Sequence, residues 1–278
     1  MQSSQAITDF TINFKGKSAH SALDPWNGRS ALDAAEFFTS GINSLREHVK
    51  PSVRMHYVYK NAGQVPNVVP AEASVWLWIR DSKRSGVAAI AERMKNIAKG
   101  AALMAGVDSE VIMNNGLYEI LTNETGAKTL QKNIEIIGPI RYTEEEIKFA
   151  NHIMKAYGSE PKGIDGRIHP IKKKLKDPAG GSTDVGDVSY IVPEISLYAT
   201  TAPAGAPWHS WVVVSCGGMS IGHKGMLFAS KSLGTTMVDL FEDKALIIKI
   251  REEFIQKKGK EVWKAMLPDG PAPIPNLN

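Results

Sequence analysis

The sequence has 278 residues, of which 43% are hydrophobic and 22% charged, a balance typical of a folded globular protein. Its formal net charge of +4 is spread along the chain apart from the Lys172–Lys174 run, which argues against a nucleic-acid partner. No apolar run is long enough to cross a bilayer, and the single cysteine, Cys216, excludes an intramolecular disulfide and a cysteine-based zinc site. We therefore expect a cytoplasmic protein with no membrane partner.

The first part of the chain predicts the order strand, helix, strand, strand, helix, strand. Apolar and polar residues alternate in the strands, and Ser30 is a good N-cap for the first helix, which Pro51 follows. The expected strands lie near residues 10–14, 53–59, 75–79 and 110–113, and the expected helices near 31–49 and 87–104. This order is typical of a ferredoxin-like split βαβ sandwich, with both helices on one face of an antiparallel sheet.

The pattern changes after about Leu117. Helical segments lead to a glycine-rich loop, a strand-like run at residues 191–199 and a final long helix with an apolar stripe after Gly225. Glu144, Glu145 and Glu146 follow Thr143, so they predict a capping box rather than a catalytic pair of carboxylates. This part predicts a portion of an α/β domain, and the expected domains are residues 1–117 and 118–278.

Short motifs in both parts carry a family resemblance. The segments are Gly16-Lys17-Ser18-Ala19-His20 with Pro25 and Gly28, then Gly181-Ser182-Thr183-Asp184, and finally Ala206-Pro207-Trp208-His209-Ser210. Together they resemble the dimeric two-zinc aminoacylases and carboxypeptidases. The resemblance implies that residues 1–117 form the lid, which carries the dimer contact, and that residues 118–278 form only the C-terminal part of an α/β zinc-peptidase catalytic domain.

The resemblance also implies a function. The complete enzymes hydrolyse an amide bond of a small molecule, here an N-acyl amino acid such as an acyl-glutamate, with zinc or manganese. Metal-dependent amide hydrolysis needs a polarised water, a carboxylate base and a donor for the developing oxyanion. His209 matches the family's last metal-binding histidine, whereas a lone histidine in another context would be structural or exposed.

His20 matches a histidine that reaches across the dimer to hydrogen-bond the oxyanion in the partner's active site; the alternative is a polar residue at a strand end. Asn67 matches a substrate-binding position in the lid, although an ordinary turn asparagine would look the same. Arg80 could pair bidentately with a substrate carboxylate or form a surface salt bridge. Ser182, Thr183 and Asp184 match a loop that lines the substrate pocket and also suit a helix N-cap.

The family's remaining metal ligands have no counterpart in the sequence. No His-x-Asp motif occurs in it, and a catalytic zinc needs about three protein ligands. We therefore expect that the chain alone binds no metal and does not hydrolyse amides. Two alternatives stay open: a non-catalytic dimerisation module, acting as a homodimer or with a related subunit to which it supplies residues, and a start site assigned too late.

Overall fold

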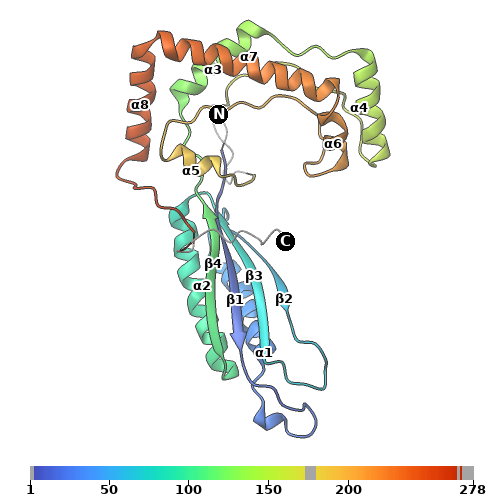
Figure 1. Ribbon diagram of the computed structural model, residues 1–278, viewed down its shortest axis with the longest axis vertical. Coiled ribbons are helices and arrows are strands. Elements are labelled where there is room, and N and C mark those ends of the chain that lie inside the picture. The colour runs from blue at the N-terminus through green and yellow to red at the C-terminus, as the bar shows by residue number, and fades with distance from the viewer. Residues whose placement is uncertain (1–2, 173–179, 268–269, 271–278) are drawn as a thin grey trace. The chain divides into compact units, whose positions relative to one another are not determined.

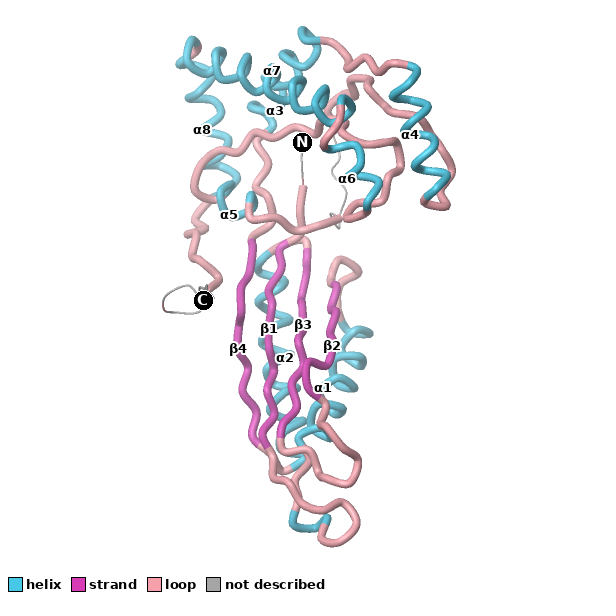
Figure 2. The backbone as a smooth tube through the Cα atoms, turned by 45° about the vertical axis from the view of Figure 1, so that its right-hand side comes forward, coloured by secondary structure: helices cyan, strands magenta, loops and turns pink. Residues whose placement is uncertain are grey.

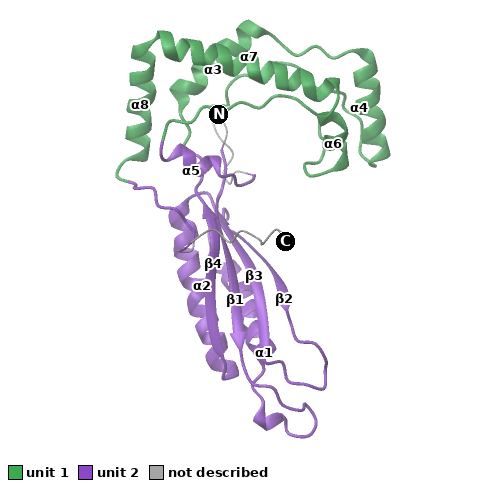
Figure 3. Ribbon diagram, viewed as in Figure 1, with its two compact units in different colours: residues 1–2, 121–175, 192–260 green, residues 3–120, 176–191, 261–278 purple. Residues whose placement is uncertain are grey.

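The computed structural model describes residues 3–172, 180–267 and 270 of the chain. The chain forms two compact units whose segments alternate along the sequence (Figures 1 and 3). Unit 1 contains residues 1–2, 121–175 and 192–260, and unit 2 contains residues 3–120, 176–191 and 261–278. The domain boundary at residues 117 and 118 stays a prediction. The lysine run at residues 172–174 lies outside the described residues from residue 173.

Unit 2 is built on a four-stranded antiparallel sheet with the strand order β2-β3-β1-β4. The elements are β1 (Ala6–Lys15), α1 (Ala31–Leu45), β2 (Arg54–Asn61), β3 (Glu72–Asp81), α2 (Arg84–Ala105), β4 (Asp108–Leu117) and the short α5 (Val185–Ser189). Helices α1 and α2 pack on one face of the sheet (Figure 2). This arrangement confirms the predicted ferredoxin-like sandwich.

Alternating side chains explain why these strands form. Phe10, Ile12 and Phe14 of β1 are buried toward the helices, and the register places Phe10 opposite Leu77 of β3. Phe14 also contacts Phe38 of α1, with ring centroids 6.0 Å apart. The helix begins where the sequence predicts, because the side chain of Ser30 accepts a hydrogen bond from the backbone N–H of Asp33.

The described residues of unit 1 form helices joined by irregular segments. Its helices are α3 (Glu124–Ile137), α4 (Glu144–Ala156), α6 (Trp211–Gly217), α7 (Ser220–Glu242) and α8 (Lys244–Lys258). The expected strand at residues 191–199 is wrong: this segment is irregular, and only Glu194 makes an isolated bridge, to Thr122. A strand requires a neighbour for its backbone N–H and C=O groups, and the described residues offer this segment no continuous one.

Two other expectations for unit 1 concern its helices. The long helix expected after Gly225 is confirmed as α7, and α8 follows it: Asp243 ends α7 and then caps α8 by accepting from the backbone N–H of Leu246. The capping box at Thr143 and Glu146 is confirmed at the start of α4. The side chain of Glu146 is buried and ion-paired with Lys224, so it serves structure. Among the described residues, no helix is both long and apolar enough for a membrane span.

Candidate functional site

His20 lies in the loop that joins β1 to α1, and a close backbone approach shapes that loop. Lys17 and Arg29 form an antiparallel bridge with two backbone hydrogen bonds of 2.9 Å. A Cβ atom on Gly16 would lie 2.1 Å from the carbonyl oxygen of Arg29, so only glycine fits there. The glycine of the motif is therefore explained by packing.

The structure brings His20 and Asn67 together. His20 forms an antiparallel bridge with Val68, and the backbone N–H of Ser21 donates to the carbonyl oxygen of Asn67 at 3.0 Å. A cavity of about 490 Å³ adjoins this contact and is lined mainly by residues 62–66 and 68–70 together with Ser21 and Ser30. Two residues that the sequence separates by 47 positions thus share one end of unit 2.

The turn after His20 fixes the tautomer of its imidazole. The ring Nδ1 atom accepts from the backbone N–H groups of Ala22 and Leu23, both at 3.2 Å. An Nδ1 atom that accepts hydrogen bonds carries no proton, so the proton of the neutral ring resides on Nε2. His20 is exposed, and its Nε2–H is therefore a donor that another molecule can use.

A second pair of expected residues meets at the opposite end of the sheet. The Nη1 atom of Arg80, at the end of β3, donates to the hydroxyl of Ser182 at 3.0 Å. Thr183 donates to Asp184 at 3.3 Å, and Asp184 precedes α5 without forming a side-chain cap. The two ends of the sheet are about 30 Å apart. Strand β1 runs from Ala6, which pairs with Asp81, to Lys15, which pairs with Glu72, and each residue advances a strand by about 3.3 Å.

His209 lies in unit 1, in the turn before α6. Its φ of 63° is in the left-handed region, and no other described non-glycine residue has a positive φ. Such a conformation is strained and is often kept at functional positions. The turn is held by the Ser210 hydroxyl, which donates to the carbonyl oxygen of Pro207 at 2.6 Å.

The donor set around His209 does not amount to a metal site. No three described His, Cys, Asp or Glu side chains lie close enough together to hold a metal ion. The residues present therefore do not by themselves fit the two-metal centre that the family resemblance implies.

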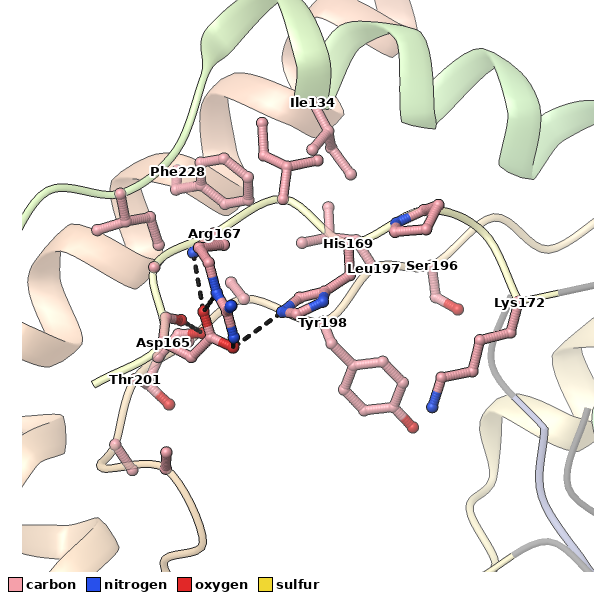
Figure 4. Close-up of a pocket in the computed structure, with 18 of the residues that line it drawn as sticks. Ile134, Asp165, Arg167, His169, Lys172, Ser196, Leu197, Tyr198, Thr201 and Phe228 are labelled. Atoms are coloured by element: carbon pink, nitrogen blue, oxygen red, sulfur yellow. Dashed lines mark hydrogen bonds and ion pairs between the residues drawn. The ribbon is translucent and has the colours of Figure 1, made fainter. Parts of the chain in front are cut away.

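Unit 1 contains a further cavity, of about 560 Å³, that sequence reasoning missed (Figure 4). Arg167 binds the carboxylate of Asp165 bidentately, with Nε and Nη2 each at 2.8 Å, and the Nε2 atom of His169 lies 2.9 Å from the same carboxylate. These contacts, those of Arg167 first, hold the pKa of Asp165 well below its usual range. No motif of the resembled family includes Asp165, Arg167 or His169, so the cluster is recognised from its contacts in the structure.

Comparisons with known proteins agree with the family resemblance. Residues 3–103 match the model of the peptidase dimerisation domain. The chain is 32% identical to one of the subunits of p-aminobenzoyl-glutamate hydrolase of Escherichia coli, over 94% of this chain and 60% of the relative. It is 27% identical to human Xaa-Arg dipeptidase, over 91% of this chain and 52% of that relative.

A solved structure shows the same fold. The crystal structure of an aminobenzoyl-glutamate utilization protein from Klebsiella pneumoniae superposes with a TM-score of 0.53 at 18% identity, over 84% of this chain and 48% of that one. The chain thus spans about half to three fifths of the length of the relatives that it matches. Residues 3–103 thus match a peptidase dimerisation domain, and the chain as a whole is similar to a subunit of p-aminobenzoyl-glutamate hydrolase.

Proposed function

We propose that the chain contributes to an enzyme that cleaves the amide bond of an N-acyl amino acid such as aminobenzoyl-glutamate. The observation that carries this proposal is the hydrogen bonding of the His20 Nδ1 atom, which accepts from two backbone N–H groups in a loop whose backbone also contacts Asn67 and Val68. With Nδ1 as the acceptor, Nε2 is the donor of the neutral ring. A fixed donor is what stabilises the oxyanion that develops during amide hydrolysis. The sequence similarity to p-aminobenzoyl-glutamate hydrolase supports the choice of reaction.

In this proposal each candidate residue has a role that follows from its place in the fold. His20 donates to the oxyanion, Asn67 binds the substrate beside it, and Arg80 binds a carboxylate of the substrate. Ser182 positions Arg80, while Thr183 and Asp184 line the loop next to it. About 30 Å of sheet separates His20 from Arg80. A small substrate is shorter than that, so the two residues of one copy serve different substrate molecules, which supports action of His20 across a dimer.

A metal site is proposed as well, with His209 as one ligand to zinc or manganese. Because the described residues supply no group of three ligands, we expect further ligands from another polypeptide or from sequence beyond these residues, and no hydrolysis by this chain alone. We also propose that the chain forms a homodimer through the dimerisation domain or associates with a related subunit.

A non-catalytic dimerisation subunit is the second candidate, and the match of residues 3–103 to the dimerisation domain favours it. One experiment separates the two candidates. Metal content is measured by mass spectrometry on the purified chain after loading with zinc or manganese, with His209→Ala beside it, and cleavage of aminobenzoyl-glutamate is followed in the same samples.

The outcomes have distinct meanings. About two metals per chain, lost in the variant and accompanied by cleavage, would make the chain an enzyme by itself and contradict the expected inactivity. No metal and no cleavage alone, with cleavage on adding a related subunit, would support the proposed enzyme. No cleavage with any related subunit, together with a stable dimer, would favour the non-catalytic role.

A further inference from the structure

A short segment that follows α8 in the sequence belongs to unit 2. Residues 261–266, which we call the strap, form neither helix nor strand and are part of unit 2 (Figure 3). An irregular segment has no ladder or helix hydrogen bonds of its own, so its place depends on individual contacts. The contacts of the strap therefore show which part of unit 2 it supports.

Two side chains of the strap bind charged partners. The Nε1–H group of Trp263 donates to the Oδ1 atom of Asp187 at 2.8 Å. Glu261 forms an ion pair with Arg84, but these side chains are 42% and 33% exposed, and exposed ion pairs contribute little. A hydrogen bond to a carboxylate is stronger than one between neutral groups, so we expect the Trp263 contact to be the more important of the two.

A buried tyrosine holds the backbone of the strap. The Tyr118 hydroxyl accepts from the backbone N–H of Lys264 at 3.1 Å and donates to the carbonyl oxygen of the same residue at 3.2 Å. Tyr118 is fully buried, and a buried hydroxyl needs such partners. Met266 approaches β4 closely, because a Cβ atom on Gly116 would lie 3.0 Å from the Met266 Cβ atom. The strap is thus fixed along the end of β4.

Asp187 connects the strap to α5. Its Oδ2 atom accepts from the backbone N–H of Tyr118 at 3.2 Å, while its Oδ1 atom accepts from Trp263. The helix also packs on Tyr118: the Tyr118 and Tyr190 rings are 4.8 Å apart, and a Cβ atom on Gly186 would lie 2.0 Å from the Tyr118 carbonyl oxygen. One carboxylate of α5 therefore binds both the end of β4 and the strap.

The loop at residues 182–184 leads directly into α5. A Cβ atom on Gly181 would meet nothing within 4 Å, so packing holds the start of this loop weakly. Two hydrogen bonds attach it there, from the Gln5 backbone N–H to Gly181 at 2.6 Å and from Arg80 to the Ser182 hydroxyl at 3.0 Å. The other end of the loop is continuous with the packed helix, so a shift of α5 must move the loop.

We infer that the strap positions the loop at residues 182–184 by holding Asp187, and that Trp263 is the positioning residue. This inference rests on the proposed function, in which the loop lines the substrate pocket. Trp263 contacts α5 and not the loop itself, so it acts on substrate binding through Asp187. The sequence motifs do not include residues 261–266, and the role of the strap follows from its contacts.

The test is hydrogen exchange of the whole purified chain, measured by mass spectrometry for the wild type and for Trp263→Phe. Phenylalanine keeps an aromatic ring in the strap and removes the N–H donor. The backbone N–H of Asp187 donates to the carbonyl oxygen of Asp184 at 3.0 Å, so exchange there reports opening of α5. We expect exchange in residues 185–191 to become about tenfold faster, because the variant loses a hydrogen bond to a carboxylate.

Trp76→Phe is the matched control. The Trp76 Nε1–H group donates to Asp9 at 2.5 Å, so this variant removes the same kind of hydrogen bond from the sheet. It should leave exchange in residues 185–191 unchanged. Tyr118→Phe removes the other attachment of the strap but keeps the ring, and it should accelerate exchange in residues 185–191 as Trp263→Phe does.

Two results would overturn the inference. One is wild-type exchange at residues 185–191 in both Trp263→Phe and Tyr118→Phe. The other is an equal acceleration throughout unit 2, which would mean that the strap supports general stability and does not position the loop.

Kinetics separate the failure of this inference from that of the proposed function. In an assembly that hydrolyses the amide, Trp263→Phe should raise KM about three- to tenfold and change kcat less than about twofold, because the loop affects binding. An unchanged KM despite faster exchange would overturn the role of the strap and leave the proposed function intact. Faster exchange at residues 185–191 without hydrolysis in any assembly would support the strap and contradict the proposed function.

Discussion

The His20 imidazole combines two tasks that single substitutions can separate. Its Nδ1 atom holds the turn by accepting from the backbone N–H groups of Ala22 and Leu23, and no acceptor among the described residues takes the proton of Nε2. The Oδ1 atom of asparagine can replace Nδ1 as an acceptor but provides nothing at the position of Nε2. In an assembly that hydrolyses the amide, His20→Asn should lower kcat by about 10²- to 10³-fold and change KM little.

The control for this prediction is the stability of the turn. We expect the Tm of His20→Asn to stay within about 2 °C of the wild-type value, because the turn contacts are kept, and His20→Ala to lose both activity and some stability. Differential scanning calorimetry and initial rates check both. Full activity in His20→Asn would show that Nε2 has no catalytic role.

Gly16 provides a test of how the same loop is held. A methyl group there would meet the Arg29 carbonyl oxygen at 2.1 Å and force apart the bridge between Lys17 and Arg29. Gly16→Ala should therefore lower the free energy of unfolding by about 1–3 kcal/mol in urea denaturation. Gly100→Ala is the matched control, since nothing lies within 4 Å of its added methyl group, and it should be neutral or slightly stabilising.

At the scale of elements, the start of α4 depends on pH through Glu146. Burial alone would raise its pKa, but hydrogen bonds from the side chains of Lys224 and Ser220 and from the Thr143 backbone lower it to about 2. A carboxyl group with a depressed pKa contributes stability above its unfolded pKa of about 4.5, and loses that contribution as the pH falls toward 2.

The wild-type chain should therefore lose unfolding free energy between about pH 4.5 and 2 partly through this contact. Glu146→Gln should lower stability at pH 7 by about 1–3 kcal/mol, because it leaves Lys224 without its charged partner. The difference from wild type should shrink in the acid range. Glu144→Gln is the control, since Glu144 is exposed and its contact with Lys148 is 4.0 Å long. A difference that does not vary with pH would refute the role of Glu146.

The comparison of elements also shows what the sequence could predict. In unit 2 the apolar faces of the strands pack against α1 and α2, which lie in the same stretch of about 100 residues. The alternation of apolar residues and the helix caps were therefore sufficient to predict the ferredoxin-like fold. At residues 191–199 the composition favours a strand, but a strand also depends on a partner that local sequence does not specify. The prediction failed at that point.

The candidate site likewise has some features that the sequence predicted and others that it did not. Motif matches predicted His20, Asn67 and the loop at Ser182, the chemistry of a strand-end arginine added Arg80, and the structure brings these residues together in two pairs. The tautomer of His20, the φ of His209 and the contact of Trp263 with Asp187 depend on backbone geometry and on contacts between distant segments. Such relations arise only after folding, so the sequence could not reveal them.

At the scale of the whole molecule, apolar side chains are distributed unevenly between the units. The core of unit 2 is extensive, whereas the described core of unit 1 consists of a few residues around Ile153, Met154 and Ile221. Helices α7 and α8 expose several large apolar side chains, namely Met226, Leu227, Leu233, Met237, Val238, Phe241, Ile247, Ile248 and Ile255. Many large apolar side chains exposed along two consecutive helices favour association.

We therefore predict concentration-dependent self-association of the purified chain through α7 and α8. The double variant Leu233→Glu with Phe241→Glu should lower the average mass measured by light scattering, because a charged side chain in an apolar contact must lose its hydration. Since both side chains are exposed, the variant should keep the far-UV circular dichroism of the wild type. Ile136→Glu with Val214→Glu makes the same chemical change at exposed positions of α3 and α6 in unit 1, outside the dimerisation domain. If this control lowers the mass equally, general charge is responsible and the apolar surface of α7 and α8 is not the contact.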